Sequence, residues 1–156
     1  MTSFSSISTR PGLPADLGKQ LRGAITSQFG QRFDAVATFE AGHAAGLVAM
    51  QAALTKLTAG TFEACVVAGV DSYLMPATLA WLEEHDQLHG AGRLNNAWGL
   101  VPGEGSGAAL LTVGRVVERL GIEPLGRVLS VGNGFETDRI KTQTVCIGEG
   151  LTATFR

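Results

Sequence analysis

One histidine stands where the local pattern of the chain could support nucleophilic or acid–base chemistry. His43 follows the short apolar stretch Phe33–Phe39, which is rich in β-forming residues, and precedes the helix-favouring run Ala44–Leu57. The free N–H groups and the dipole of a helix N-terminus favour negative charge. A cysteine at position 43 would therefore have a lowered pKa and act as a nucleophile. The same field disfavours imidazolium, so we expect His43 to be neutral if it is buried.

A neutral imidazole at this position leaves three roles open. It could act as a general base or weak nucleophile, it could bind a ligand without chemistry, or it could only make a structural hydrogen bond. An acyl-imidazole is labile and loses its acyl group to water, so His43 is a poor substitute for a thiol that must hold an acyl group as a thioester.

A second candidate site is a glycine-rich stretch around one glutamate. Gly103, Gly105 and Gly107 flank Glu104 and predict a sharp turn before a buried strand. The stretch leads into a strand and lacks Gly-Lys-Ser/Thr, so it is a weak match to a phosphate loop. Glu104 could be catalytic, or it could be a partly buried carboxylate bonded to loop N–H groups.

An acidic–hydroxyl pair follows the apolar strand that is expected at residues 63–70. Gly69, Asp71 and Ser72 occupy this end, and the pair could cap a helix, form a turn, or line a site at the carboxyl end of the strand.

Other reactive residue types give weaker signals. His85 and His89 are four residues apart but straddle an expected helix end, and a metal site there would need a further ligand. Cys65 lies in an apolar run and is interpreted as a small buried hydrophobic residue, and Cys146 as a structural residue. The sequence therefore predicts no metal site and no bound cofactor.

Composition narrows the class of protein. The chain has 156 residues, of which 45% are hydrophobic and 17% charged, which is enough to bury a core. The net charge is −2 and no basic stripe is visible, so a nucleic-acid partner is not expected. Apolar runs are far shorter than the ~20 residues of a membrane helix, and the first residues lack the apolar region of a secretory signal. We expect a cytoplasmic protein without a membrane partner.

The predicted elements alternate between helix and strand, as in a layered α/β domain. Helices are expected from Pro14 to a stop at Gly30, over Ala44–Leu57 as a segment buried on most sides, from Pro76, over Arg115–Leu120, and from Ile147 to Arg156. Strands are expected at residues 33–39, 63–70, 105–113 and 125–132, with a loop over residues 85–96. The final segment has no stop signal, which suggests a chain cut inside a helix.

In their order and spacing these segments resemble β-ketoacyl synthases. His43–Met50 is similar to the family's nucleophile region, with histidine in place of cysteine. Val67–Ser72 is similar to its Gly-Gly-Val-Asp-Ser-like strand end, and Trp98–Gly107 to its Asp-Gly-Phe-Val-x-Gly-Glu-Gly-x-Gly stretch. The resemblance runs from about Phe33 to about Gly134.

The resemblance implies a thiolase-like layered α/β/α fold. Residues 1–156 would form a single partial domain, the core of the amino-terminal half, shortened at both ends relative to the family. In this family the strand before the nucleophile pairs with its twin across a dimer axis, and residues Asp34–Phe39 would take that part.

The resemblance also implies a function, with one departure. It suggests a 3-oxoacyl-[acyl-carrier-protein] synthase-like protein of fatty-acid or polyketide-type condensation, with acyl carrier protein or an acyl thioester as partner and a homodimer or heterodimer as assembly. His43 replaces the nucleophile, and the family's two catalytic histidine contexts do not occur. We therefore expect this chain to be inactive by itself and to serve as a dimer partner or acyl-binding scaffold. The alternatives are an acyl-thioester hydrolase or acyltransferase with His43 as base, and a non-enzymatic interaction module that uses Asp34–Phe39.

Overall fold

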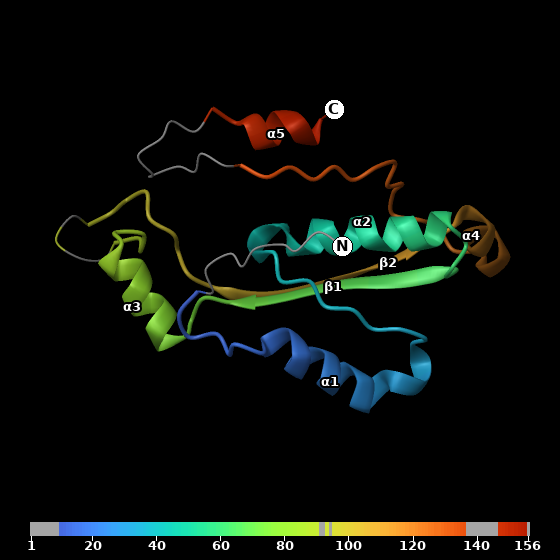
Figure 1. The fold of residues 1–156 in the computed structure, drawn as a ribbon, viewed down its shortest axis with the longest axis horizontal. Coiled ribbons are helices and arrows are strands. Elements are labelled where there is room, and N and C mark those ends of the chain that lie inside the picture. The colour runs from blue at the N-terminus through green and yellow to red at the C-terminus, as the bar shows by residue number, and fades with distance from the viewer. Residues whose placement is uncertain (1–9, 91–92, 94, 137–146, 156) are drawn as a thin grey trace. The chain divides into compact units, whose positions relative to one another are not determined.

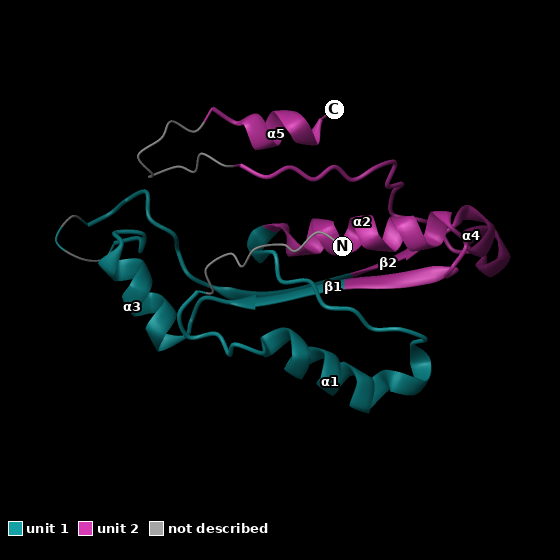
Figure 2. Cartoon of the chain, viewed as in Figure 1, with its two compact units in different colours: residues 1–43, 68–108 teal, residues 44–67, 109–156 magenta. Residues whose placement is uncertain are grey.

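The chain forms two compact units, each built from segments distant in sequence. The structure is a computed structural model that describes residues 10–90, 93, 95–136 and 147–155 (Figure 1). Unit 1 contains residues 1–43 and 68–108, and unit 2 contains residues 44–67 and 109–156 (Figure 2). The chain contains both helices and strands, as the sequence predicts for the α/β class, but the two alternate only over residues 45–120.

The first helix of unit 1 begins one turn after Pro14. Helix α1 spans Leu17–Phe29, and its first N–H donates to the carbonyl of Pro14 at 3.2 Å, so the proline opens the turn that leads into the helix. Gly18 is the buried residue of α1. A side chain there would collide with the carboxyl group of Glu40, so the glycine allows the later segment to pass close by. The 3₁₀ helix η1, Gly30–Arg32, follows and confirms the predicted stop.

The strand predicted at Phe33–Phe39 is wrong. The backbone of Phe33 is extended, with φ −128° and ψ 127°, but no residue of the segment is assigned to a strand. Among the described residues, positions 34–39 make no backbone–backbone hydrogen bond. A strand requires a hydrogen-bonded neighbour, and the described part of the chain provides none here.

The second helix of unit 1 confirms the start predicted at Pro76. Helix α3 spans Pro76–Glu84, with the proline in its first turn and Thr78 and Leu82 buried. The described residues of the segment 85–96 form a loop, as predicted, with an isolated parallel bridge between Leu88 and Leu100.

Two strands form the sheet. Strand β1 spans Ala64–Ser72 and strand β2 spans Glu104–Thr112. In unit 1 the N–H of Tyr73 donates to the carbonyl of Gly103 at 2.9 Å. The end of β1 therefore lies beside the start of β2, so the pair is antiparallel. Both strands confirm predicted ones, at residues 63–70 and 105–113.

The strands are less covered than their apolar runs predict. Val66, Val70 and Leu110 are 51%, 64% and 59% exposed, whereas a continuously apolar strand is expected to be covered on both faces. The prediction of buried strands is therefore wrong, because residue type reports a tendency to be covered and a two-stranded sheet supplies few covering neighbours. Among the described residues, the buried hydrophobic side chains are Ala53, Leu57, Leu82 and Val116.

Unit 2 contains the helix predicted after His43. Helix α2 spans Ala45–Thr58, in agreement with the expected run. It ends where the N–H of Thr61 bonds to the carbonyl of Lys56 at 2.9 Å and Gly60 takes a positive φ of 68°, an arrangement that satisfies its last carbonyls.

Helix α2 is not buried on most sides, so that prediction is wrong. Ala53 and Leu57 are its buried residues, whereas Leu47 is 55% exposed. Its alanine-rich composition explains its helicity without requiring cover on every face, because alanine is the best helix former.

The two remaining helices of unit 2 confirm predicted helices, whereas the last predicted strand does not form. Helix α4 spans Gly114–Leu120 and is closed by Gly121 in the left-handed conformation, and helix α5 spans Glu149–Thr154. No residue of 125–132 is assigned to a strand. The side chain of Gln51 donates to the carbonyl of Val131 at 3.3 Å. This carbonyl therefore bonds to a side chain, whereas a strand needs the backbone of a neighbouring strand as its partner. Within the described ranges, no helix combines the length and apolar character needed to cross a membrane.

Candidate functional site

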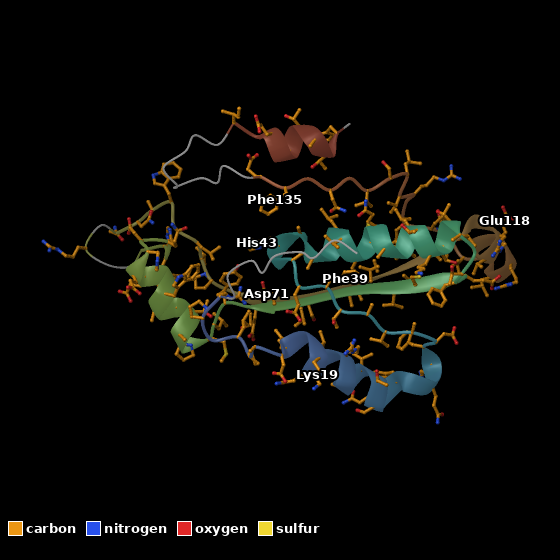
Figure 3. The ribbon with its side chains drawn as sticks, viewed as in Figure 1. Lys19, Phe39, His43, Asp71, Glu118 and Phe135 are labelled. Atoms are coloured by element: carbon orange, nitrogen blue, oxygen red, sulfur yellow. The ribbon has the colours of Figure 1, made fainter. Side chains whose placement is uncertain are left out.

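A group of polar side chains in unit 1 gathers around Arg10. We call it the His43 cluster, and it comprises Arg10, His43, Asp71, Ser72, Tyr73 and Glu104. Figure 3 labels His43 and Asp71. Nη2 of Arg10 lies 2.5 Å from Oδ1 of Asp71, Nη1 lies 3.4 Å from Oδ2, and Nη2 also donates to the carbonyl of Ser72 at 2.8 Å. The guanidinium therefore holds the end of β1 through its side chain and its backbone.

The turn that carries Arg10 is anchored on α3. The hydroxyl of Thr78, which is fully buried, donates to the carbonyl of Pro11 at 2.6 Å. Gly12 has φ +92°, and a Cβ on it would lie 3.1 Å from Cβ of Met75. Only glycine adopts this conformation readily at such a close approach. These contacts fix the backbone on either side of Pro11 and thereby direct Arg10 toward β1.

Tyr73 joins Arg10 to His43. Cζ of Arg10 lies 3.8 Å from the centroid of the Tyr73 ring, which is a cation–π contact. The hydroxyl of Tyr73 and Nε2 of His43 are 3.1 Å apart and form a hydrogen bond. The two rings are nearly parallel, with an interplanar angle of 8° and centroids 6.1 Å apart. A continuous series of contacts therefore leads from Asp71 through Arg10 and Tyr73 to His43.

His43 is exposed, which corrects the expectation of a buried imidazole. It lies in the 3₁₀ helix η2, Gly42–Ala44, which directly precedes α2 along the chain. The preceding segment is not a strand and the following helix is not enclosed. The imidazole is therefore available to a ligand from solvent, and its contacts come from Tyr73.

The ion pair shifts the pKa values of both partners. The hydrogen bond from Arg10 holds the pKa of the Asp71 carboxyl below its usual value of 3.8, and the hydrogen bond to Asp71 raises the pKa of Arg10. The side chain of Arg10 is 12% exposed and that of Asp71 is 55% exposed, so the carboxylate remains in contact with water. Both groups are charged at neutral pH.

Ser72 and Glu104 form a second branch of the cluster. The hydroxyl of Ser72 donates to Oε2 of Glu104 at 3.1 Å and accepts the N–H of Leu74 at 3.3 Å, so the predicted turn forms. The alternative of a helix cap is wrong, because Met75 is the N-cap of α3 and no side chain caps that helix. Glu104 is exposed and bonds to a hydroxyl, which corrects the prediction of a partly buried carboxylate held by loop N–H groups.

The three glycines around Glu104 do not form the predicted sharp turn. Gly69 lies in β1, Gly103 directly precedes β2, and Gly105 and Gly107 lie within β2. None of them has a positive φ, and a Cβ on any of them would meet open space. The sharp turn expected around Glu104 is therefore wrong, since β2 begins at that residue.

The other candidate residues, His85, His89 and Cys65, do not belong to the His43 cluster. Nδ1 of His85 lies 2.9 Å from the carbonyl of Trp81, and Nδ1 of His89 lies 3.2 Å from the carbonyl of Ala97. Within residues 10–90, 93, 95–136 and 147–155, no three His, Cys, Asp or Glu side chains form a group that could hold a metal ion. Cys65 is a free thiol of intermediate exposure, and burial raises its pKa. Cys146 lies outside the described residues.

Sequence reasoning missed Arg10 and Tyr73. Arg10 is 61 residues from Asp71, so no local pattern links the two. Tyr73 carried a usable signal, since it is the chain's one tyrosine and directly follows the acidic–hydroxyl pair. An aromatic ring with a polar tip at a strand end is a candidate to bond both a cation and an imidazole.

Neither of two surface cavities includes the cluster. One, of about 490 Å³, lies in unit 2 against α2 and residues 129–131. The other lies in unit 1 around residues 26–32.

Comparison with known proteins identifies the family. Residues 8–115, more than half of the chain, match the family model of the β-ketoacyl synthase N-terminal domain. No curated protein and no solved structure shows a significant match. The chain belongs to the β-ketoacyl synthase N-terminal domain family, and its helix and strand content is that of a partial α/β thiolase-like fold.

The matched range differs from the resemblance seen in the motifs. It begins before residue 33 and includes Arg10, and it ends before the segment Leu125–Gly132. His43 and the whole His43 cluster lie inside it. Family membership therefore rests on this match and not on burial of His43.

Proposed function

We propose that this chain is a condensing-enzyme-like subunit that binds acyl thioesters without forming a covalent acyl-enzyme at position 43. The observation that carries the proposal is the contact between His43 and Tyr73 inside the matched range. The resemblance of His43–Met50 to the family's nucleophile region supports it. The exposed imidazole offers a polar group to a thioester, whereas an acyl group on imidazole would be lost to water.

The proposed setting is the cytoplasm, in acyl-chain building of the fatty-acid or polyketide type, with acyl carrier protein as the bearer of the thioester. The proposed assembly is a homodimer, or a heterodimer with a second synthase subunit. Residues Asp34–Phe39 support this assembly. Their backbone is unpaired among the described residues, and Phe39 is 37% exposed, so a strand of another subunit could add to this segment.

The test compares wild type with His43→Cys and His43→Ala. Each protein is incubated with octanoyl coenzyme A, its intact mass is measured, and any adduct is located by peptide mapping, which separates position 43 from Cys65. Binding is measured in parallel by calorimetry. We expect wild type to bind without an adduct, His43→Ala to bind at least about tenfold more weakly through loss of a hydrogen bond, and His43→Cys to gain an adduct at position 43. An octanoyl group on His43 of wild type would refute the proposal.

A hydrolase is the second candidate, favoured by the hydrogen bond between Tyr73 and His43, because an imidazole bonded to a hydroxyl can act as a general base. Release of coenzyme A from octanoyl coenzyme A, followed with a thiol reagent, distinguishes the two. Turnover by wild type that His43→Ala abolishes would establish the hydrolase. We expect no turnover above the rate without protein.

A further inference from the structure

Arg10 makes four contacts that converge on the end of β1, which is more than a surface ion pair requires. Its N–H groups donate to both carboxylate oxygens of Asp71 and, from Nη2, to the carbonyl oxygen of Ser72, and the guanidinium covers the ring of Tyr73 at 3.8 Å. Its side chain is 12% exposed. A planar guanidinium can make bidentate and stacking contacts together, whereas the ammonium of lysine cannot.

These contacts restrict the ring of Tyr73. The backbone of Tyr73 is fixed by its bond to Gly103, and one face of its ring is covered by the guanidinium. The planes of the Tyr73 and His43 rings differ by 8°. The hydroxyl is therefore held where it meets Nε2 of His43 at 3.1 Å.

The hydrogen bond has a consequence for the other ring nitrogen. A neutral imidazole carries one proton, and the partner of one nitrogen determines which nitrogen holds it. If the Tyr73 hydroxyl donates to Nε2, the ring proton is on Nδ1. The exposed imidazole then presents Nδ1–H as a donor.

We propose that Arg10 and Tyr73 are positioning residues that fix His43 in the Nδ1–H tautomer, so that Nδ1–H donates to the carbonyl oxygen of a bound acyl thioester. This inference rests on the proposed function for its ligand, but the tautomer itself does not depend on that function. A merely structural tie between residue 10 and β1 would hold the backbone and would not require a particular tautomer at His43.

The experiment measures the His43 tautomer by ¹⁵N–¹H correlation spectra of histidine-labelled full-length chain. The spectra are taken at about pH 8. Wild type is compared with Tyr73→Phe, which keeps the ring and removes the hydroxyl, and with Arg10→Lys, which keeps the charge. Arg119→Lys is the matched control, because Arg119 also pairs with a carboxylate but belongs to unit 2.

We expect the Nδ1–H tautomer in wild type and in Arg119→Lys, and a shift toward Nε2–H in Tyr73→Phe and Arg10→Lys. Binding of octanoyl coenzyme A should weaken about tenfold in both cluster variants and remain unchanged in the control. A wild-type His43 in the Nε2–H form, or a tautomer that Tyr73→Phe does not move, would overturn the positioning role whatever the binding data. Failure of wild type to bind octanoyl coenzyme A while the tautomer behaves as expected would instead overturn the proposed function, and with it the assignment of the ligand.

Discussion

The two units each carry an arginine–carboxylate group, and the two groups differ in what surrounds them. In unit 1 the guanidinium of Arg10 is 12% exposed and also contacts Tyr73 and the carbonyl of Ser72. In unit 2 Glu63 pairs with Arg119 at 2.9 Å and with Arg115 at 3.6 Å, and all three side chains are at least half exposed. The first group contacts an aromatic ring, whereas the side chains of the second are open to solvent.

The comparison shows why a count of ion pairs does not identify a site. In both groups a hydrogen bond from arginine lowers the pKa of the carboxyl, Asp71 in unit 1 and Glu63 in unit 2. Exposed pairs contribute little, because water and salt screen them. The group in unit 1 differs because its arginine also contacts Tyr73, which bonds to His43, and this series of contacts is the basis of the role that we propose for it.

The largest difference in stability between the two units is expected from two threonine hydroxyls, each of which bonds to the backbone near one arginine–carboxylate group. Thr78 is fully buried and bonds to Pro11, whereas Thr112 bonds to the carbonyl of Glu63 at 2.7 Å near solvent. Thr78→Val should lower the free energy of unfolding by about 1–3 kcal/mol, because the hydrogen bond from a fully buried hydroxyl is lost and the carbonyl of Pro11 loses this partner. Thr112→Val should cost clearly less. Urea denaturation measures both, and equal losses would mean that the two anchors are equivalent.

The next effect concerns the arginines themselves. Arg10→Ala should destabilise the protein by about 1–2 kcal/mol, because it loses charge-assisted hydrogen bonds and the cation–π contact. The expected loss is kept this small because the side chain of Asp71 is half exposed and solvent screens the ion pair. Arg119→Ala should leave stability unchanged within error. Thermal unfolding of both variants at low and high salt checks this. A loss in Arg10→Ala that vanishes in about 1 M salt, where the screening length is about 3 Å, would contradict the distinction.

Acid sensitivity should separate wild type from Arg10→Ala. The folded-state pKa of Asp71 is lowered below its usual 3.8, so its contribution is fully present above that value and is lost as the pH falls through the lowered pKa. Wild type should therefore lose stability below about pH 4, and Arg10→Ala should lose less over the same interval. Urea titrations between about pH 2 and 5 measure the slopes. Identical slopes in wild type and Arg10→Ala would exclude a stabilising ion pair in unit 1.

The smallest effect is kinetic and concerns Cys65. Burial raises the pKa of its thiol above the usual 9.0, so less thiolate is present at a given pH than in a free cysteine. Alkylation of Cys65 in a Cys146→Ser background should be slower than that of an unstructured cysteine peptide and should accelerate with rising pH. Labelling followed by mass spectrometry gives the rates. A rate equal to that of the peptide would contradict the raised pKa.

Local signals predicted the helices well. Pro14 and Pro76 indicated helix starts, and Gly30, Gly60 and Gly121 indicated helix ends, because each acts through the backbone of its immediate neighbours. Strands β1 and β2 were also predicted. The segments 33–39 and 125–132 were not, since their composition favours an extended backbone but a strand depends on a partner elsewhere in the chain.

The site was predicted in part. His43, Asp71, Ser72 and Glu104 were chosen from type and position, and the structure brings all four into one cluster. The exposure of His43 and Glu104 could not be predicted, because it depends on which elements cover them. Arg10 could not be found from spacing, because its contacts span 61 residues.

The most direct test is an experimental structure of the chain with octanoyl coenzyme A. The account predicts the thioester carbonyl oxygen within hydrogen-bonding distance, about 2.7–3.2 Å, of Nδ1 of His43, with Tyr73 still bonded to Nε2 and the thioester intact. An acyl group bonded to the imidazole, or a thioester bound away from the His43 cluster, would contradict it.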